Sequence, residues 1–192
     1  ITSRSLERNT SDWVKELEEH KRNISDAKKL IGYQTLSTFD LPDNRFDSTP
    51  LLDIIKIIEG EKAKFQPDIV FTHHGGDLNI DHQRTFEAIM TACRPTEDEC
   101  VTTIITFETP SGTEWRASSD PRHFVPNFFV ELQSKHLQAK VDAMECYAYE
   151  KRSFPHPRSS QGLRILAGYR GISVGKKYVE AFQIIRHIIK IN

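Results

Sequence analysis

Side chains that can bind a metal ion or transfer a proton are concentrated between His73 and His82. A short apolar run, Ile69–Phe71, precedes them and has the length and composition of a buried strand. Apolar residues at helical spacing follow from Phe86 onward. Ligands of an open α/β sheet bind outside the carboxyl ends of the strands, so this strand, polar loop and helix predict the active site of an enzyme.

Within this stretch a carboxylate and an imidazole are adjacent in sequence, at Asp81 and His82. Asp81 is a suitable N-cap for the following helix, which places His82 in the first helical turn. A carboxylate often supports a metal-bound histidine, and two further histidines, His73 and His74, stand at the end of the strand. The alternative is a turn without chemistry, because Asp, Asn, Gly and His all suit turns.

The stretch from Pro67 to His82 resembles the second signature of the PIG-L/LmbE family, which are zinc-dependent N-acetylglucosaminyl deacetylases. It is most similar to bacterial members from surface-polysaccharide clusters. The resemblance implies that His82 is a zinc ligand and that Asp81 supports neighbouring groups by hydrogen bonding. Asn79 stands where many members have a histidine that stabilises the oxyanion, and an amide can donate a hydrogen bond there but cannot transfer a proton.

The family's first signature, Ala-His-Pro-Asp-Asp-Glu, does not occur in this sequence. In the family it supplies the other two metal ligands and the general base at the end of the first strand. We therefore expect residues 1–192 to be a single, N-terminally truncated deacetylase-like domain that lacks its first strand and helix. Catalytic zinc ordinarily takes three protein ligands, so this fragment is predicted to be inactive.

Substrate contacts are expected from the loop that follows a β-branched strand at residues 101–107. Glu108, Ser111 and Trp115 should emerge at the same edge as the metal loop, and Trp115 suits stacking on a sugar. A structural role for this tryptophan is the alternative. Arg4, near the chain start, is a candidate for binding an anionic group, with a solvated loop arginine as the alternative.

A second candidate substrate segment, Arg152–Ser159, holds His156 between two prolines that stiffen it. A rigid loop that presents histidine and arginine suits an anion or oxyanion site, although a structural turn is an alternative. The resemblance extends to this segment and to residues 167–182. It implies that His156 stabilises the tetrahedral intermediate and that Arg158 or Arg170 lies near a phosphate or nucleotide.

The composition is that of a soluble globular protein, with 38% hydrophobic residues, 28% charged residues and a formal net charge of −1. A near-neutral charge argues against binding nucleic acids through their phosphates. Three cysteines without CxxC spacing fit a reducing compartment, and no apolar run reaches the length of a membrane span. We expect a cytoplasmic protein whose partner is a small N-acetylated sugar, and we leave its oligomeric state open.

The expected order of elements predicts a Rossmann-like, three-layer α/β/α fold with a mostly parallel sheet. The elements are a helix ending at Gly32, a strand at Thr35–Phe39, a deeply packed helix capped by Thr49, a strand at 68–72, helices at 82–93 and 134–149, and a strand at 101–107. Residues 181–191 are compatible with a strand or a helix.

The predicted function is hydrolysis of the N-acetyl group of an N-acetylglucosamine-type sugar, linked to a nucleotide or lipid carrier, by a zinc-dependent amide hydrolase. One alternative is a metal-free sugar- or nucleotide-binding module, whose saccharide binding would be insensitive to a chelator. The other is a non-catalytic protein on the same fold. Absence of the first signature from the upstream reading frame would favour that second alternative.

Overall fold

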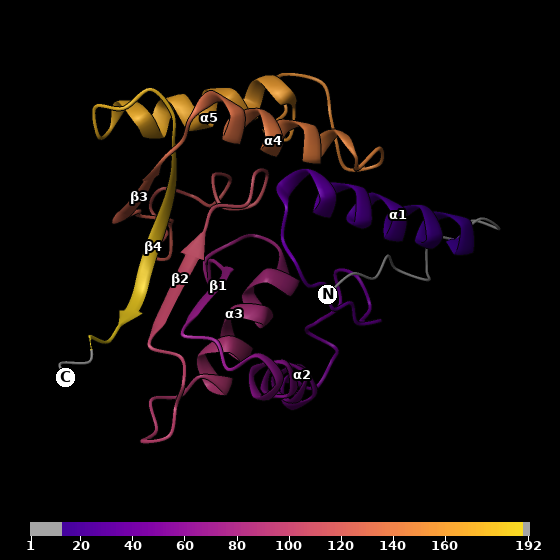
Figure 1. Cartoon of the computed structure of the whole chain (residues 1–192), viewed down its shortest axis with the longest axis vertical. Helices are drawn as coiled ribbons and strands as arrows, with labels where there is room; N and C mark the ends of the chain where they lie inside the picture. Colours follow the sequence, from indigo (N-terminus) through magenta and orange to yellow (C-terminus); the bar gives the residue numbers. More distant parts are fainter. Residues whose placement is uncertain (1–12, 190–192) are drawn as a thin grey trace. The chain divides into compact units, whose positions relative to one another are not determined.

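The computed structural model describes residues 13–189 and divides the chain into two compact units (Figure 1). The first unit comprises Ile1–Asp43 and Phe129–Glu180, and the second comprises Asn44–Phe128 and Ala181–Asn192. Arg4, a predicted substrate residue, lies outside the described residues. No helix between residues 13 and 189 is long and apolar enough to cross a membrane.

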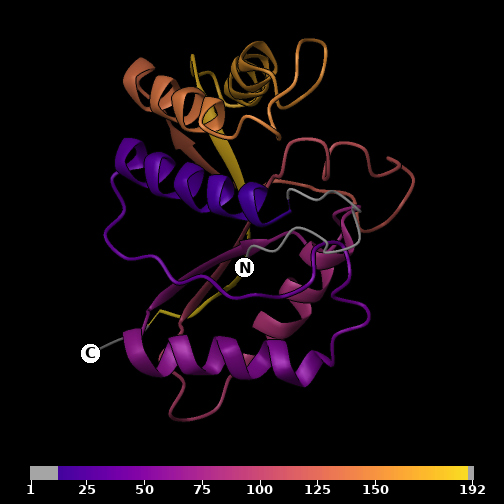
Figure 2. The same ribbon diagram turned by 90° about the vertical axis from the view of Figure 1, so that its right-hand side faces the viewer.

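The second unit is built around a parallel pair of strands, β1 (Ile69–His73) and β2 (Thr103–Phe107). Their register pairs Ile69 with Thr103 and His73 with Phe107, so both strands end at the same edge. Helix α3 (Ile80–Ala92) returns from that edge and packs against β1, and α2 (Leu51–Phe65) packs against α3. The two helices lie side by side in both ribbon views (Figures 1 and 2).

The sheet is mixed, because β4 (Val179–His187) runs antiparallel to β2. Its strand order is β1-β2-β4-β3, with β3 at Phe128–Glu131. The predicted α/β fold is thereby confirmed, with one parallel pair where we expected a mostly parallel sheet. The undecided C-terminal segment is a strand, and its alternating inward residues, Val179 and Ala181, are buried.

The first unit contains helices α1 (Trp13–Ile31), α4 (Ser134–Glu145) and α5 (Ser160–Ile172), of which α1 and α5 both pack against α4. Helix α1 ends where predicted, because Gly32 adopts a φ of 88° and its N–H bonds the carbonyl of Lys28. Helix α4 begins at Ser134 as predicted but ends at Glu145 rather than near residue 149, and it buries Leu137 and Val141.

Two local predictions, the strand at Thr35–Phe39 and the cap and burial of α2, are wrong. Thr35–Phe39 forms no strand, since these mostly exposed residues have no partner strand in the described chain. Helix α2 has Pro50 rather than Thr49 as its N-cap, and only one side of it is deeply buried, because Leu52 is 57% exposed.

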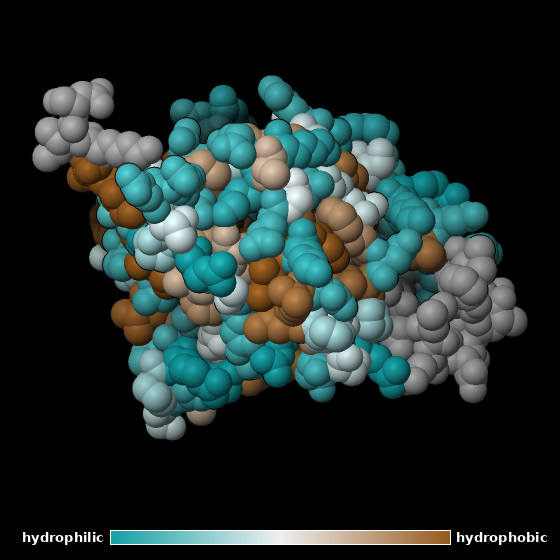
Figure 3. All heavy atoms as spheres, turned by 90° about the horizontal axis from the view of Figure 1, so that it is seen from below, coloured by the Kyte–Doolittle hydropathy of each residue, from teal (hydrophilic) through white to brown (hydrophobic). Residues whose placement is uncertain are grey.

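Apolar and polar residues are interspersed on the face of the molecule seen in Figure 3.

Candidate active site at the carboxyl edge of the parallel strands

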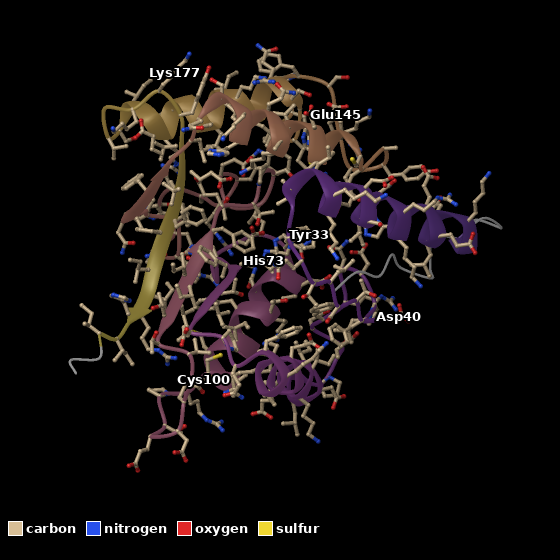
Figure 4. All side chains as sticks on the ribbon, in the orientation of Figure 1. Tyr33, Asp40, His73, Cys100, Glu145 and Lys177 are labelled. Atoms are coloured by element: carbon tan, nitrogen blue, oxygen red, sulfur yellow. The ribbon has the colours of Figure 1, made fainter. Side chains whose placement is uncertain are left out.

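The predicted site loop begins at the carboxyl end of β1 and is closed by the N-terminus of α3. His73 is the last residue of β1, and His82 lies in the first turn of α3, as predicted (Figure 4 labels His73). The predicted N-cap is wrong: Asn79 is the N-cap, and its side-chain oxygen accepts the N–H of Asp81. Because Asn79 caps the helix, the Asp81 side chain is available for a different contact.

His82 is held by a carboxylate at its edge. Its Nδ1 lies 3.1 Å from Oδ1 of Asp77, a residue with no exposed surface; this is ion-pair distance, and the angle does not meet hydrogen-bond geometry. The same Oδ1 accepts the backbone N–H of Asn79 at 2.8 Å, which fixes the orientation of the carboxylate. Oδ2 of Asp77 has no hydrogen-bond partner among the described residues. A buried carboxylate with an unmet oxygen is costly to the fold, so the arrangement points to a role beyond stability.

The face of the His82 ring is covered by a second imidazole. The rings of His73 and His82 are stacked, with centroids 3.9 Å apart and planes inclined by 2°. Burial, together with the neighbouring His82, lowers the pKa of His73 from 6.5 to about 3, although the Asp77 carboxylate acts in the opposite direction. His73 is therefore neutral at neutral pH and restrains His82 through ring packing rather than charge.

Asp81, the predicted orienting residue, contacts a distant segment instead of His82. Its two carboxylate oxygens accept the backbone N–H groups of Asn44, at 2.7 Å, and Phe46, at 3.0 Å. The side chain of Asn79 joins this network by donating to Oδ1 of Asn44 at 3.1 Å. Asp81 and Asn79 thus fasten residues 44–46 to the start of α3, while Asp77 is the carboxylate beside His82.

The loop after β2 packs tightly on the loop after β1. Arg116 donates to the carbonyl oxygens of Gly76, at 2.6 Å, and Asp77, at 3.0 Å. Gly112 lies so close to Asp77 that an added Cβ would be 2.5 Å from the carboxylate. His73 Nδ1 also approaches the hydroxyl of Thr109, at 3.5 Å. The structure therefore brings together the two loops that the sequence placed at one edge.

His74 has a structural contact rather than one directed at His82. Its Nε2 lies 2.7 Å from the carbonyl oxygen of Arg122, and because a carbonyl only accepts, Nε2 carries the proton. The ring is 8% exposed and packs edge-on against Phe124. His74 thereby holds the 120–124 segment against the site loop.

The predicted substrate residues divide between the two units. Glu108, Ser111 and the 53% exposed Trp115 follow β2 in the second unit, at the edge that carries His73. The remaining described candidates belong to the first unit: His156, Arg158 and Arg170. There, His156 Nδ1 accepts the backbone N–H of Arg158 at 3.1 Å, and the Arg158 guanidinium pairs with Glu150. Their roles stay predictions.

Among the described residues, the resemblance implies one zinc ligand, His82. A metal-bound histidine commonly has a carboxylate on its second ring nitrogen, which is the relation of Asp77 to His82. Among residues 13–189, however, no three His, Cys, Asp or Glu side chains are grouped so that they could hold a metal ion. His82 therefore fits one position of a zinc site, and the described residues do not complete it.

Sequence reasoning placed His73 at the strand end without assigning it a role, and it assigned no role to Asp77. Both stand within the stretch that carries the resemblance, but the predicted supporting role was given to Asp81, which is adjacent to His82 in sequence and whose side chain accepts N–H groups from residues 44 and 46. One signal was present in the sequence. Asp77 precedes the capping residue Asn79, so its side chain can reach back to His82 in the first turn of α3. Loop geometry, not sequence distance, decides which carboxylate reaches the imidazole.

Comparison with known protein families gives a match to the family described as PIG-L: GlcNAc-PI de-N-acetylase, over residues 3–93. That range is just under half of the chain and includes β1, the site loop and α3. No curated protein matches the sequence.

Solved structures share the fold at low sequence identity. The conserved protein TT1542 from Thermus thermophilus has a TM-score of 0.69 and 18% identity, over 91% of this chain and 76% of that one. N,N'-diacetylchitobiose deacetylase from Pyrococcus horikoshii has a TM-score of 0.69 and 16% identity, over 96% and 71%. GalB, the 4-carboxy-2-hydroxymuconate hydratase from Pseudomonas putida KT2440, has a TM-score of 0.69 and 17% identity, over 97% and 79%. A deacetylase and a hydratase are equally similar, so the shared fold does not select the reaction.

Proposed function

We propose that this protein hydrolyses the N-acetyl group of an N-acetylglucosamine-type sugar and that His82 is one ligand of a catalytic zinc ion. The observation that carries the proposal is the His82 imidazole, held at its edge by buried Asp77 and on its face by His73. These residues lie inside the range that matches the de-N-acetylase family. That match favours deacetylation over the hydration performed by the equally similar GalB.

In this proposal the chain's own residues orient and bind. The Asp77 carboxylate lies beside Nδ1 of His82 and favours a proton on that nitrogen, which would leave Nε2 to bind a metal ion. Bound zinc would polarise the acetyl carbonyl and lower the pKa of a water molecule. Asn79 and Asp81 fix the start of α3 and the 44–46 segment at the edge of the site. His156 is proposed to donate a hydrogen bond to the developing oxyanion.

The substrate side of the proposal uses the loop after β2. Trp115 offers an exposed indole face to a sugar, and Glu108 and Ser111 offer polar groups to its hydroxyls. The resemblance supports further roles for three arginines with an anionic nucleotide or lipid carrier: Arg4, Arg158 and Arg170. It also supports a cytoplasmic enzyme of bacterial surface-polysaccharide synthesis.

The proposal is tested by measuring acetate release from N-acetylglucosamine conjugates by the protein that the gene encodes. We expect turnover that a chelator abolishes, that zinc restores, and that His82→Ala lowers by more than ~100-fold, since loss of a ligand exceeds loss of its supporting group. Because the described residues supply one imidazole ligand, we expect residues 1–192 alone to release no acetate.

Two results would contradict the proposal. One is acetate release that a chelator does not affect. The other is saccharide binding without turnover that is also unchanged in His82→Ala, which would assign the 108–115 loop to a metal-free binding module. The Trp115→Ala variant serves as a comparison, because it should weaken sugar binding while leaving the metal content unchanged.

A further inference from the structure

Positive charge is concentrated in one part of the chain. Residues 151–179, here called the basic segment, contain seven of the 26 lysines and arginines and none of the 27 aspartates and glutamates. The whole chain has a formal net charge of −1, so this segregation is strong. The segment includes α5 and the two lysines after it, of which Lys177 is labelled in Figure 4.

Helix α5 has apolar residues on two opposite sides. The side packed within the first unit is formed by Leu163, Ala167 and Gly171, which are buried and spaced four residues apart. The opposite side exposes large apolar residues at positions i, i+4 and i+7, here called the exposed stripe: Ile165 at 53%, Tyr169 at 60% and Ile172 at 80%. A surface helix ordinarily has polar residues on that side, so an exposed apolar stripe marks an interaction surface.

The cations of the basic segment make two kinds of contact. Some residues of the basic segment have acidic partners: Lys151 with Glu145, Lys176 with Glu131, and Arg158 with Glu150. Others contact uncharged groups. Arg164 donates to the amide oxygen of Gln138, Arg152 donates to two backbone carbonyls, and Lys177 lies over the ring of Tyr178. Three cations of the basic segment therefore have uncharged partners, and one of them, Arg164, lies on α5 itself.

We propose that α5 and Lys177 dock on a lipid bilayer surface that carries anionic headgroups. The exposed stripe enters the boundary between headgroups and acyl chains, and Arg164 on α5 and Lys177 after it contact lipid phosphates. Charge complementarity selects this partner, because the basic segment contains no acidic residue and three of its cations, Arg152, Arg164 and Lys177, contact uncharged groups. The contact lies on the membrane surface, and it does not depend on the proposed deacetylation.

Sedimentation with lipid vesicles tests the proposal. We expect the protein to sediment with vesicles containing phosphatidylglycerol, to remain in solution with vesicles of phosphatidylcholine alone, and to be released by high salt. The double variant Ile165→Ser/Ile172→Ser should lower the bound fraction about ten-fold, because the apolar contribution is lost. Arg164→Gln and Lys177→Gln should each lower the partition coefficient about five-fold.

Leu52→Ser is the matched control, since Leu52 is an equally exposed leucine on α2, outside the basic segment. It should not change vesicle binding, and circular dichroism should show that all variants are folded. The proposal is overturned if the protein stays in solution with anionic vesicles at low salt, or binds both lipid compositions equally. It is also overturned if the stripe instead drives self-association, seen as an oligomer that the double serine variant dissociates in sedimentation velocity.

Discussion

The two ends of the β1–β2 pair differ in how many hydrogen bonds their buried polar groups make. At the amino end, Lys62 donates to the carbonyl of Ala92 and pairs with Glu99 at 2.7 Å. The other oxygen of Glu99 accepts the N–H of Val101, and the terminal nitrogens of Arg186 donate to two carbonyls, although its Nε has no partner in the described chain. These contacts join α2, α3, β4 and the segment just before β2.

At the carboxyl end four buried polar atoms lack a hydrogen-bond partner within the described residues: Thr72 Oγ1, His74 Nδ1, Asp77 Oδ2 and His82 Nδ1. Asp77 is fully buried, yet only one of its oxygens is satisfied. Unmet polar capacity of this kind is retained where a ligand or reacting group supplies the missing contact. The polar groups at the amino end therefore stabilise the fold, whereas those at the carboxyl end surround the imidazole of His82.

The largest expected effect concerns the close packing of the site loop. In Gly76→Ala the new Cβ would lie 1.8 Å from the carbonyl oxygen of Arg122, so the loop has to move. We expect the free energy of unfolding to fall by about 3 kcal/mol, and the contact between Arg122 and His74 to be lost with it.

Gly60→Ala is the control for this variant, because nothing lies within 4 Å of the added Cβ in the middle of α2. Alanine there should raise the free energy of unfolding by about 0.5–1 kcal/mol. Denaturant unfolding of both variants measures the difference. Equal effects of the two substitutions would contradict the close approach at Gly76.

The ion pair at the amino end should affect stability alone. Its side chains are only 21% exposed for Lys62 and 6% for Glu99, so Glu99→Ala leaves a largely buried ammonium. We expect a loss of about 2–3 kcal/mol in the free energy of unfolding, with the metal content of the folded protein unchanged. A loss of bound zinc in the folded variant would show that the two ends are coupled, against this account.

The carboxylate at the site should show the opposite behaviour. Asp77→Asn keeps the shape but removes the charge beside Nδ1 of His82, so we expect zinc affinity to fall about 10–100-fold in the protein that the gene encodes. The free energy of unfolding without metal should change by less than about 1 kcal/mol, since one carboxylate oxygen is already unsatisfied.

Asp81→Asn is the matched substitution, because Asp81 accepts N–H groups from residues 44 and 46 and is not the carboxylate beside His82. Zinc affinity should stay within about three-fold of the original, a change smaller than that expected for a supporting carboxylate. Calorimetric zinc titration compares the two variants. A larger loss for Asp81→Asn than for Asp77→Asn would reverse the assignment of the supporting carboxylate.

The smallest effect is a pH dependence at the amino end. Burial by itself would raise the pKa of Glu99, but hydrogen bonds from Lys62 and Val101 outweigh it and hold the pKa below the usual value of 4.5. The stabilisation is therefore present above that pH and is lost as the pH falls through the folded-state pKa. Unfolding measured at falling pH should decline more steeply for the original chain than for Glu99→Gln, and parallel curves would contradict this.

Local composition was sufficient to predict the two parallel strands and the helix that carries His82. The run Thr103–Phe107 is rich in β-branched residues, and helical spacing from Phe86 defined α3. The start of α3 could not be fixed to one residue, because Asp77, Asn79 and Asp81 can all cap a helix. Backbone contacts from residues far away in sequence decide among them, since Asp81 is engaged by Asn44 and Phe46.

Helix α5 was not predicted, because its glycines reduce helix propensity. Two of them are required by tertiary packing: a Cβ on Gly162 would lie 2.6 Å from the carbonyl oxygen of Pro157, and a Cβ on Gly171 would lie 2.4 Å from that of Lys176. The Asp77–His82 contact was equally invisible, since no periodicity reports which loop carboxylate meets an imidazole. Sequence located the site at the correct edge, and three-dimensional packing identified its members.

The central claim is that Asp77 fixes His82 with Nδ1 protonated and Nε2 available. A long-range proton–nitrogen NMR spectrum of the imidazole of His82, recorded on residues 1–192 at neutral pH, tests it without metal or substrate. We predict nitrogen shifts of the Nδ1–H form, and a mixture of tautomers in Asp77→Asn. An Nε2–H form in the original chain, or a spectrum unchanged by Asp77→Asn, would contradict the claim.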